Sequence, residues 1–152
     1  MKKHFLLGLL SLSMGACNDT TPAPGNAAAA KFDQEFTLYP QQQAQLPGSS
    51  APELTVTLAD LDFTYCPPGA ACLVGTNVFP KLNITDAQGQ SQQLAMPLAR
   101  IRTSGPNWID STNFRANGRR YLLYYRKWHV PTLPMGQIPQ KKDISVTLQV
   151  MR

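Results

Sequence analysis

The three cysteines are the residues whose sequence context indicates a specific chemical role most clearly. Cys17 follows a basic start, a short apolar stretch and the run Met14-Gly15-Ala16. This order is typical of a bacterial lipoprotein signal, and the apolar run is too short to span a bilayer. An ordinary secretory cleavage after Ala16 is the alternative, although Met14 is large for that cut. We therefore expect residues 1–16 to be removed and Cys17 to carry lipid, including palmitate.

Cys66 and Cys72 remain as an even pair once Cys17 is acylated. In the oxidising compartment that an exported protein reaches, such a pair predicts a disulfide. The ring it closes is short, so the chain-entropy model gives only about 2 kcal/mol of stabilisation. The predicted bridge therefore stiffens one loop more than it holds the fold together.

The segment 121–130 is the richest in aromatic and cationic side chains, and its strand formers predict one long strand. One face of that strand is a candidate binding strip for sugar rings or anionic polymers. The alternative, which the strand propensity of aromatic residues favours, is a central strand covered on both sides. The strip consists of Tyr121, Leu123, Tyr125, Lys127 and His129, and the opposite face of Leu122, Tyr124, Arg126 and Trp128.

Residues for catalysis or metal binding are scarce. His129 is the single histidine after residue 16, and a nucleophile needs a base beside it. A copper site needs two histidines with a free thiolate, which the chain does not supply. Asp60 and Asp62 share one strand face, where they form either a weak calcium site or a solvated acidic face. We predict no catalytic residue, no metal and no cofactor.

Hydrophobic residues recur with a period of two along most of the chain, which predicts short strands. The phase slips between Leu58 and Leu61, so we expect a β-bulge near Ala59-Asp60. Pro97 places its strand at a sheet edge, and 106–114 could hold one short helical turn. The pattern predicts an all-β protein, an immunoglobulin-like antiparallel β-sandwich, with a small β-barrel as the alternative. The alternating sets are Phe36 and Leu38; Leu54, Val56 and Leu58; Leu61 and Phe63; Val78, Leu82 and Ile84; Leu94, Met96 and Leu98; and Ile144, Val146, Leu148 and Val150.

The chain of 152 residues, with a charged fraction of 15%, predicts one domain. Residues 17–34 comprise the lipidated cysteine and a flexible tether rich in Ala, Pro and small polar residues. The single β-sandwich domain is expected to span 35–152.

Charge is divided unevenly between the two halves of the mature chain. Residues 18–99 contain two basic and seven acidic side chains, whereas residues 100–152 contain ten basic and two acidic ones. If the halves interleave in one sandwich, these charges cancel in space, and this is the arrangement we expect. If they do not, one side presents a positive field to lipid phosphates or anionic glycans.

The segment 54–75 resembles a group of uncharacterised bacterial secreted proteins and lipoproteins. They share a strand that leads into Cys-Pro, four further residues and a second cysteine, followed by a glycine, as at Cys66, Cys72 and Gly75. A Tyr-rich strand and a closing strand follow in that group, and here these would be 121–125 and 144–150. The resemblance implies a β-sandwich and an exported location, and it implies no activity.

These observations favour a lipid-anchored cell-envelope protein that acts as a non-enzymatic binding or structural module. Asn18 is not the aspartate associated with inner-membrane retention, so the outer membrane is favoured. We expect a membrane contact through the lipid, an anionic glycan or envelope protein as partner, and no nucleic acid. One alternative is a periplasmic inhibitor of a hydrolase such as lysozyme, with the Cys66–Cys72 loop as the inserting element. An envelope enzyme is the least favoured.

Overall fold

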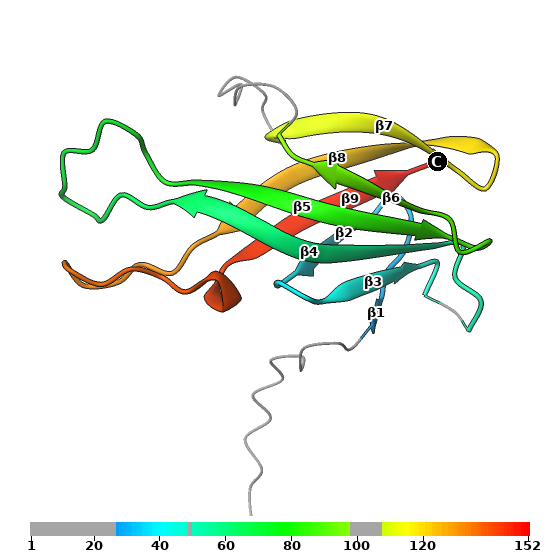
Figure 1. The fold of residues 1–152 in the computed structure, drawn as a ribbon, viewed down its shortest axis with the longest axis horizontal. Helices are drawn as coiled ribbons and strands as arrows, with labels where there is room; N and C mark the ends of the chain where they lie inside the picture. The colour runs from blue at the N-terminus through cyan, green and yellow to red at the C-terminus, as the bar shows by residue number, and fades with distance from the viewer. Residues whose placement is uncertain (1–26, 49, 98–107) are drawn as a thin grey trace, which may run out of the picture.

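The computed structural model describes residues 27–48, 50–97 and 108–152, and these form nine β-strands and one turn of 3₁₀ helix. The strands lie in two facing sheets, which confirms the predicted all-β sandwich (Figure 1). Sheet A has the order β1-β3-β4-β5-β6, and sheet B has the order β2-β9-β8-β7. The elements are β1 (Ala27–Ala29), β2 (Glu35–Leu38), β3 (Gln43–Leu46), β4 (Leu54–Thr64), β5 (Asn77–Asp86), β6 (Ser91–Ala95), β7 (Asp110–Ala116), β8 (Arg119–His129), η1 (Lys141–Asp143) and β9 (Ser145–Met151).

Each sheet is built mainly from strands that follow one another in the chain. β4, β5 and β6 form an antiparallel meander in sheet A, and β7, β8 and β9 form a second one in sheet B. β2 joins sheet B by pairing with β9. The described strands form two separate sheets with no strand pairing between them, so the fold is a sandwich and not a closed barrel. The two-layer architecture is that of immunoglobulin-like domains, while the strand order is that of two stacked meanders.

The core lies between the sheets and follows the predicted alternation. Leu54, Val56 and Leu58 on β4 are fully buried. The register of β4 against β5 shifts between Leu58 and Asp60, which confirms the bulge and returns Leu61 to the core. On sheet B, the alternating apolar residues of 144–150 are likewise buried. β9 lies between β2 and β8, so its polar outer side chains are also covered.

The folded domain begins before residue 35, which corrects the tether prediction for its last residues. β1 pairs in parallel with β3, and Ala30 and Phe32 are buried in the core. The Phe32 ring stacks on Tyr121, with 6.0 Å between the ring centroids. A Cβ on Gly48 would lie 2.4 Å from the Cβ of Ala29, so only glycine allows this close approach. The rest of the predicted tether lies outside the described residues.

The region predicted to hold a helical turn instead contributes strand β7. Its residues pair with β8 from Asp110↔Tyr125 to Ala116↔Arg119. Asn117 and Gly118 connect the two strands with φ values of 51° and 70°, as a two-residue hairpin of the Asn-Gly type requires. Residues 98–107, which include Leu98, lie outside the described part. β6 is the edge of sheet A, as Pro97 predicted.

Candidate functional site

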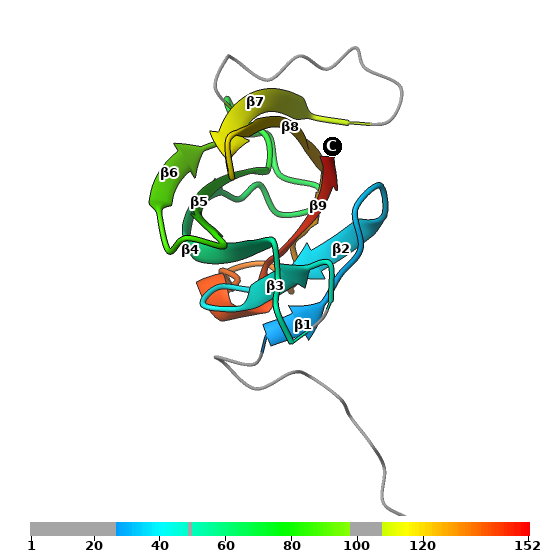
Figure 2. The same cartoon turned by 90° about the vertical axis from the view of Figure 1, so that its right-hand side faces the viewer.

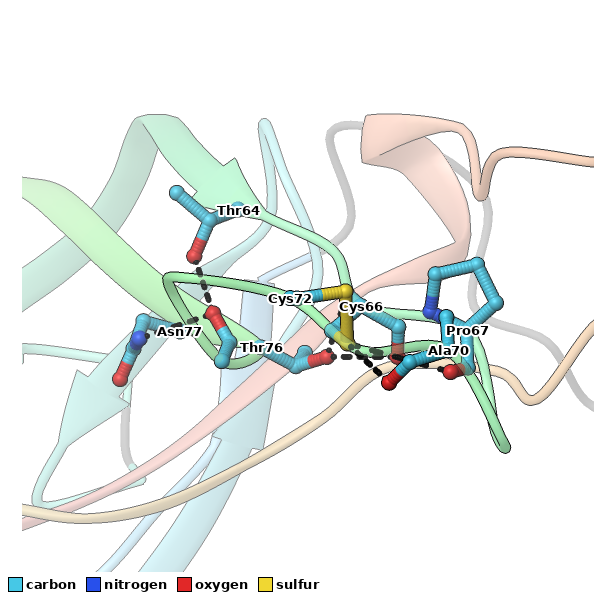
Figure 3. The surroundings of a disulfide bond; sticks show 8 residues. Thr64, Cys66, Pro67, Ala70, Cys72, Thr76 and Asn77 are labelled. Atoms are coloured by element: carbon cyan, nitrogen blue, oxygen red, sulfur yellow. Dashed lines mark hydrogen bonds between the residues drawn. A yellow bond between two sulfur atoms is a disulfide. The ribbon is translucent and has the colours of Figure 1, made fainter.

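The cysteine loop spans residues 65–76, between the end of β4 and the start of β5. Cys66 and Cys72 form a disulfide with 6.0 Å between their Cα atoms (Figure 3). At the base of the loop, the Thr64 hydroxyl donates to the Gly75 carbonyl at 2.7 Å, and the Cys66 amide donates to the Thr76 hydroxyl at 3.0 Å. The loop is therefore held by a covalent clamp and by hydrogen bonds across its base.

This clamped loop presents apolar side chains to solvent. Leu73 is fully exposed, and Val74 is 58% exposed. The sequence from residue 65 to residue 76 contains no charged side chain. Large exposed apolar side chains that lie together on a rigid element are typical of an interaction surface.

A second uncharged loop, residues 130–140, lies at the same end of the sandwich (Figure 1). The Leu133 amide donates to the Tyr65 hydroxyl at 3.1 Å, which joins the two loops. Met135 and Ile138 are 80% and 73% exposed. We name loops 65–76 and 130–140 together the apolar end.

The predicted binding strip on β8 is wrong for its first three residues. Tyr121, Leu123 and Tyr125 are buried between the sheets. The Tyr125 hydroxyl donates to the Val78 carbonyl of sheet A at 3.0 Å, and the Tyr121 hydroxyl donates to the Glu53 carboxylate. Burial raises the pKa of both phenols, and the hydrogen bond to Glu53 raises that of Tyr121 further. This face of β8 is therefore core, but the strand is not covered on both sides, because Arg120 and Lys127 are exposed on its outer face.

Lys127 and His129 do not continue the buried face, because a bulge separates them from it. The register of β8 against β9 shifts between Tyr125 and Lys127. The extra residue, Arg126, reverses the alternation, so Lys127 and His129 are exposed on the outer face of sheet B. Trp128 correspondingly packs against the core. The bulge thus divides the predicted strip between the two faces of the strand.

The outer face of β8 carries a second aromatic group. The Arg126 guanidinium lies 4.6 Å from the centre of the Tyr124 ring, and its Nε donates to Gln149 Oε1 at 2.9 Å. Trp108 meets Tyr124 edge-on, with 5.9 Å between the ring centroids, and its side chain is exposed. Sequence reasoning assigned Tyr124 and Arg126 to the alternate face and did not consider Trp108. The Asn-Gly turn at 117–118 was the signal that could have placed β7 beside β8.

Asp60 and Asp62 form a charge network rather than an open pair of carboxylates. The Lys81 Nζ lies 2.8 Å from Asp62, and the Lys141 Nζ lies 2.8 Å from Asp60. These lysine hydrogen bonds lower the pKa of both carboxyls. Within the described residues, no group of three or more His, Cys, Asp or Glu side chains is placed to hold a metal ion.

Cys17 and the predicted signal peptide lie outside the described residues. In the part of the chain that is described, no helix has the length and hydrophobicity needed to cross a membrane.

No family model, curated protein or solved structure matches this chain. The resemblance of the cysteine segment to bacterial secreted proteins therefore stays a prediction.

Proposed function

We propose that the chain is a lipid-anchored, non-enzymatic binding module of the cell envelope, and that its apolar end contacts a partner protein. One observation carries the proposal. Leu73, Val74, Met135 and Ile138 are exposed on two joined loops, one of which is cross-linked. A loop already fixed in its bound shape loses little conformational entropy on binding, so its apolar contacts contribute more fully to affinity.

The chemistry of the apolar end favours a protein over a lipid surface as its partner. Segments that insert into membranes usually combine aromatic side chains with flanking cations. Here the large exposed side chains are the aliphatic residues Leu73, Val74, Met135 and Ile138, with no aromatic ring among them. A concave apolar site on a partner protein suits such a protrusion.

Site-specific photocrosslinking in the producing cell tests this proposal. A photoreactive phenylalanine analogue replaces Leu73 or Met135, and a matched control places it at Gln88, in the exposed turn between β5 and β6. We expect one adduct of discrete mass from each of the two apolar-end positions and none from position 88. A Val74→Asp change in the Met135 variant should abolish that adduct. Equal adducts from position 88 would contradict the proposal.

Inhibition of a hydrolase is a second candidate function, favoured by the protrusion of the clamped cysteine loop. A loop of this kind can enter the cleft of an enzyme and occupy its substrate site. Adding the protein to a lysozyme lysis assay tests this directly. Inhibition that disappears in Leu73→Asp supports it, and unchanged lysis at protein excess rejects it for this enzyme.

Enzymatic activity has the least support. His129 lies on the exposed face of β8, and among the described residues none forms a hydrogen bond with its ring. A general base without a positioned nucleophile does not make a catalytic site.

A further inference from the structure

The two halves of the chain lie mostly in different sheets, yet ion pairs between them cancel part of their charge, as expected: Lys141 binds Asp60, and Arg119 and Arg152 lie beside Glu53. The strands of sheet A all come from residues before 96, and sheet B takes all but β2 from residues after 109 (Figure 2). The strands of sheet A contain one basic and three acidic side chains, and those of sheet B contain five basic and two acidic ones. Sheet B therefore carries an excess of basic side chains, part of which is paired with Glu35 and Glu53.

Two arginines of sheet B face each other without acidic compensation. Arg115 on β7 pairs directly with Arg120 on β8, and both side chains are exposed. Their neighbours in the ladder, Phe114 and Tyr121, are buried, so the two arginines point outward. Like charges directly opposite one another destabilise a sheet. No described acidic residue pairs with either arginine, and the undescribed segments contain a single acid, Asp19.

Further cations follow along the same outer face. Lys127 lies seven residues after Arg120, which is about 20 Å along a strand. Its side chain is 70% exposed and lies 3.9 Å from Glu35, the one acid of β2. Between these cationic ends stand Tyr124, fixed by Arg126, and the exposed indole of Trp108. The outer face thus alternates cation, aromatic and cation along β8.

We propose that this outer face of β7 and β8 binds an extended anionic polysaccharide. The inference concerns a second ligand and does not depend on the protein contact at the apolar end. Paired guanidinium groups bind carboxylate, sulfate or phosphate groups with charge-assisted hydrogen bonds. The exposed indole of Trp108 between the cations offers an apolar face to a sugar ring. A linear polymer matches a row of sites along one strand better than a membrane plane does.

Binding of the complete chain carrying Cys17→Ser, which has no acylation site, tests this proposal. Polygalacturonate serves as the linear anionic probe, with dextran as the neutral control. We expect binding to polygalacturonate alone, and we expect it to weaken with added salt because exposed charges are screened. The double variant Arg115→Gln/Arg120→Gln should raise the Kd at least about tenfold, since two charge-assisted contacts are lost.

The matched control is Lys31→Gln/Lys142→Gln, which removes the same charge from exposed positions outside sheet B. It should change the Kd less than about twofold, because the screened field of distant charges is weak. Binding should also shift the tryptophan fluorescence, and this shift should vanish in Trp108→Phe and persist in Trp128→Phe. Equal losses in the two double variants would show attraction by net charge alone and overturn the proposal.

A comparison with vesicles separates the polysaccharide from a membrane. Vesicles of phosphatidylcholine with one third phosphatidylglycerol present the same sign of charge on a plane. We expect them to bind the Cys17→Ser chain more weakly than polygalacturonate does. Tight binding to these vesicles without binding to polygalacturonate would assign the face to lipid phosphates and refute the polysaccharide inference.

Discussion

Replacing Tyr125 by alanine separates a core strand from a binding face. The Tyr125 ring is fully buried in sheet B, and its hydroxyl donates to the Val78 carbonyl in sheet A at 3.0 Å. The change leaves a cavity between the sheets and removes the donor of a buried carbonyl. Both effects destabilise the folded state and neither acts on the unfolded chain.

The expected loss follows from these two contributions. Deleting a buried aromatic ring costs about 3–5 kcal/mol, and the lost hydrogen bond accounts for about 1 kcal/mol of it. For a domain of this size, 1 kcal/mol corresponds to roughly 4 °C in Tm. We therefore expect Tyr125→Ala to lower the Tm by about 12–20 °C. Tyr125→Phe should keep the packing and lower it by about 4 °C.

Thermal unfolding followed by circular dichroism measures these shifts. Tyr124→Phe is the control, because it removes a hydroxyl from a neighbouring tyrosine whose ring lies on the outer face. Its Tm should equal that of the unchanged protein. A Tyr125→Ala protein that melts within a few degrees of this control would refute the assignment of the Tyr125 face to the core.

Three further predictions concern single groups. Cys66 and Cys72 should resist alkylation until a reductant is added, and reduction should cost only about 2 kcal/mol because the ring is short; two free thiols in protein taken from the envelope would contradict the bridge. The lysine hydrogen bonds depress the pKa of Asp60 and Asp62 in the folded state, so their stabilisation is complete above the ordinary carboxyl range and is lost as the pH falls through the folded values. Urea unfolding between pH 6 and pH 2 should show this loss, smaller in high salt since both groups are exposed. Cys17→Ser should leave a soluble protein that takes up no palmitate, and continued labelling would disprove the lipid site.

The sequence predicted those parts of the fold in which every second side chain is apolar. The strands at 54–58, 78–84 and 144–150 bury long aliphatic residues on one face, so the period of two is visible. The β4 bulge was also predictable, because it lies between apolar residues whose phase it shifts. In these segments the alternation of apolar and polar residues in the sequence matches the alternation of core-facing and outward-facing positions in the sandwich.

Other elements depend on pairing that the local pattern does not encode. β1 has three exposed alanines, and it is a strand because β3 offers an unpaired edge beside it. β7 has only Phe114 and Ala116 buried among its seven residues, and its partner β8 determines its conformation. The bulge at Arg126 was hidden because both faces of β8 carry aromatic residues, so a change of phase leaves no visible mark.

The distribution of basic and acidic residues between the two sheets could not be predicted because it depends on strand order. A sandwich whose halves exchange strands, as in the immunoglobulin order, would have mixed acidic and basic strands in each sheet. Two consecutive meanders place most basic strand residues in sheet B, while ion pairs such as Lys141 with Asp60 and Arg119 with Glu53 join the two halves.

The pairing of β1 with β3 also limits how far the domain can stand from a lipid anchor. The sheet holds the chain from Ala27 onward, and only nine residues, 18–26, lie between Cys17 and Ala27. The ten Cα–Cα steps from Cys17 to Ala27 span at most about 35 Å even when fully extended. If Cys17 carries lipid, the folded domain therefore begins within about 35 Å of the bilayer. A partner bound at the apolar end is then held close to the membrane as well.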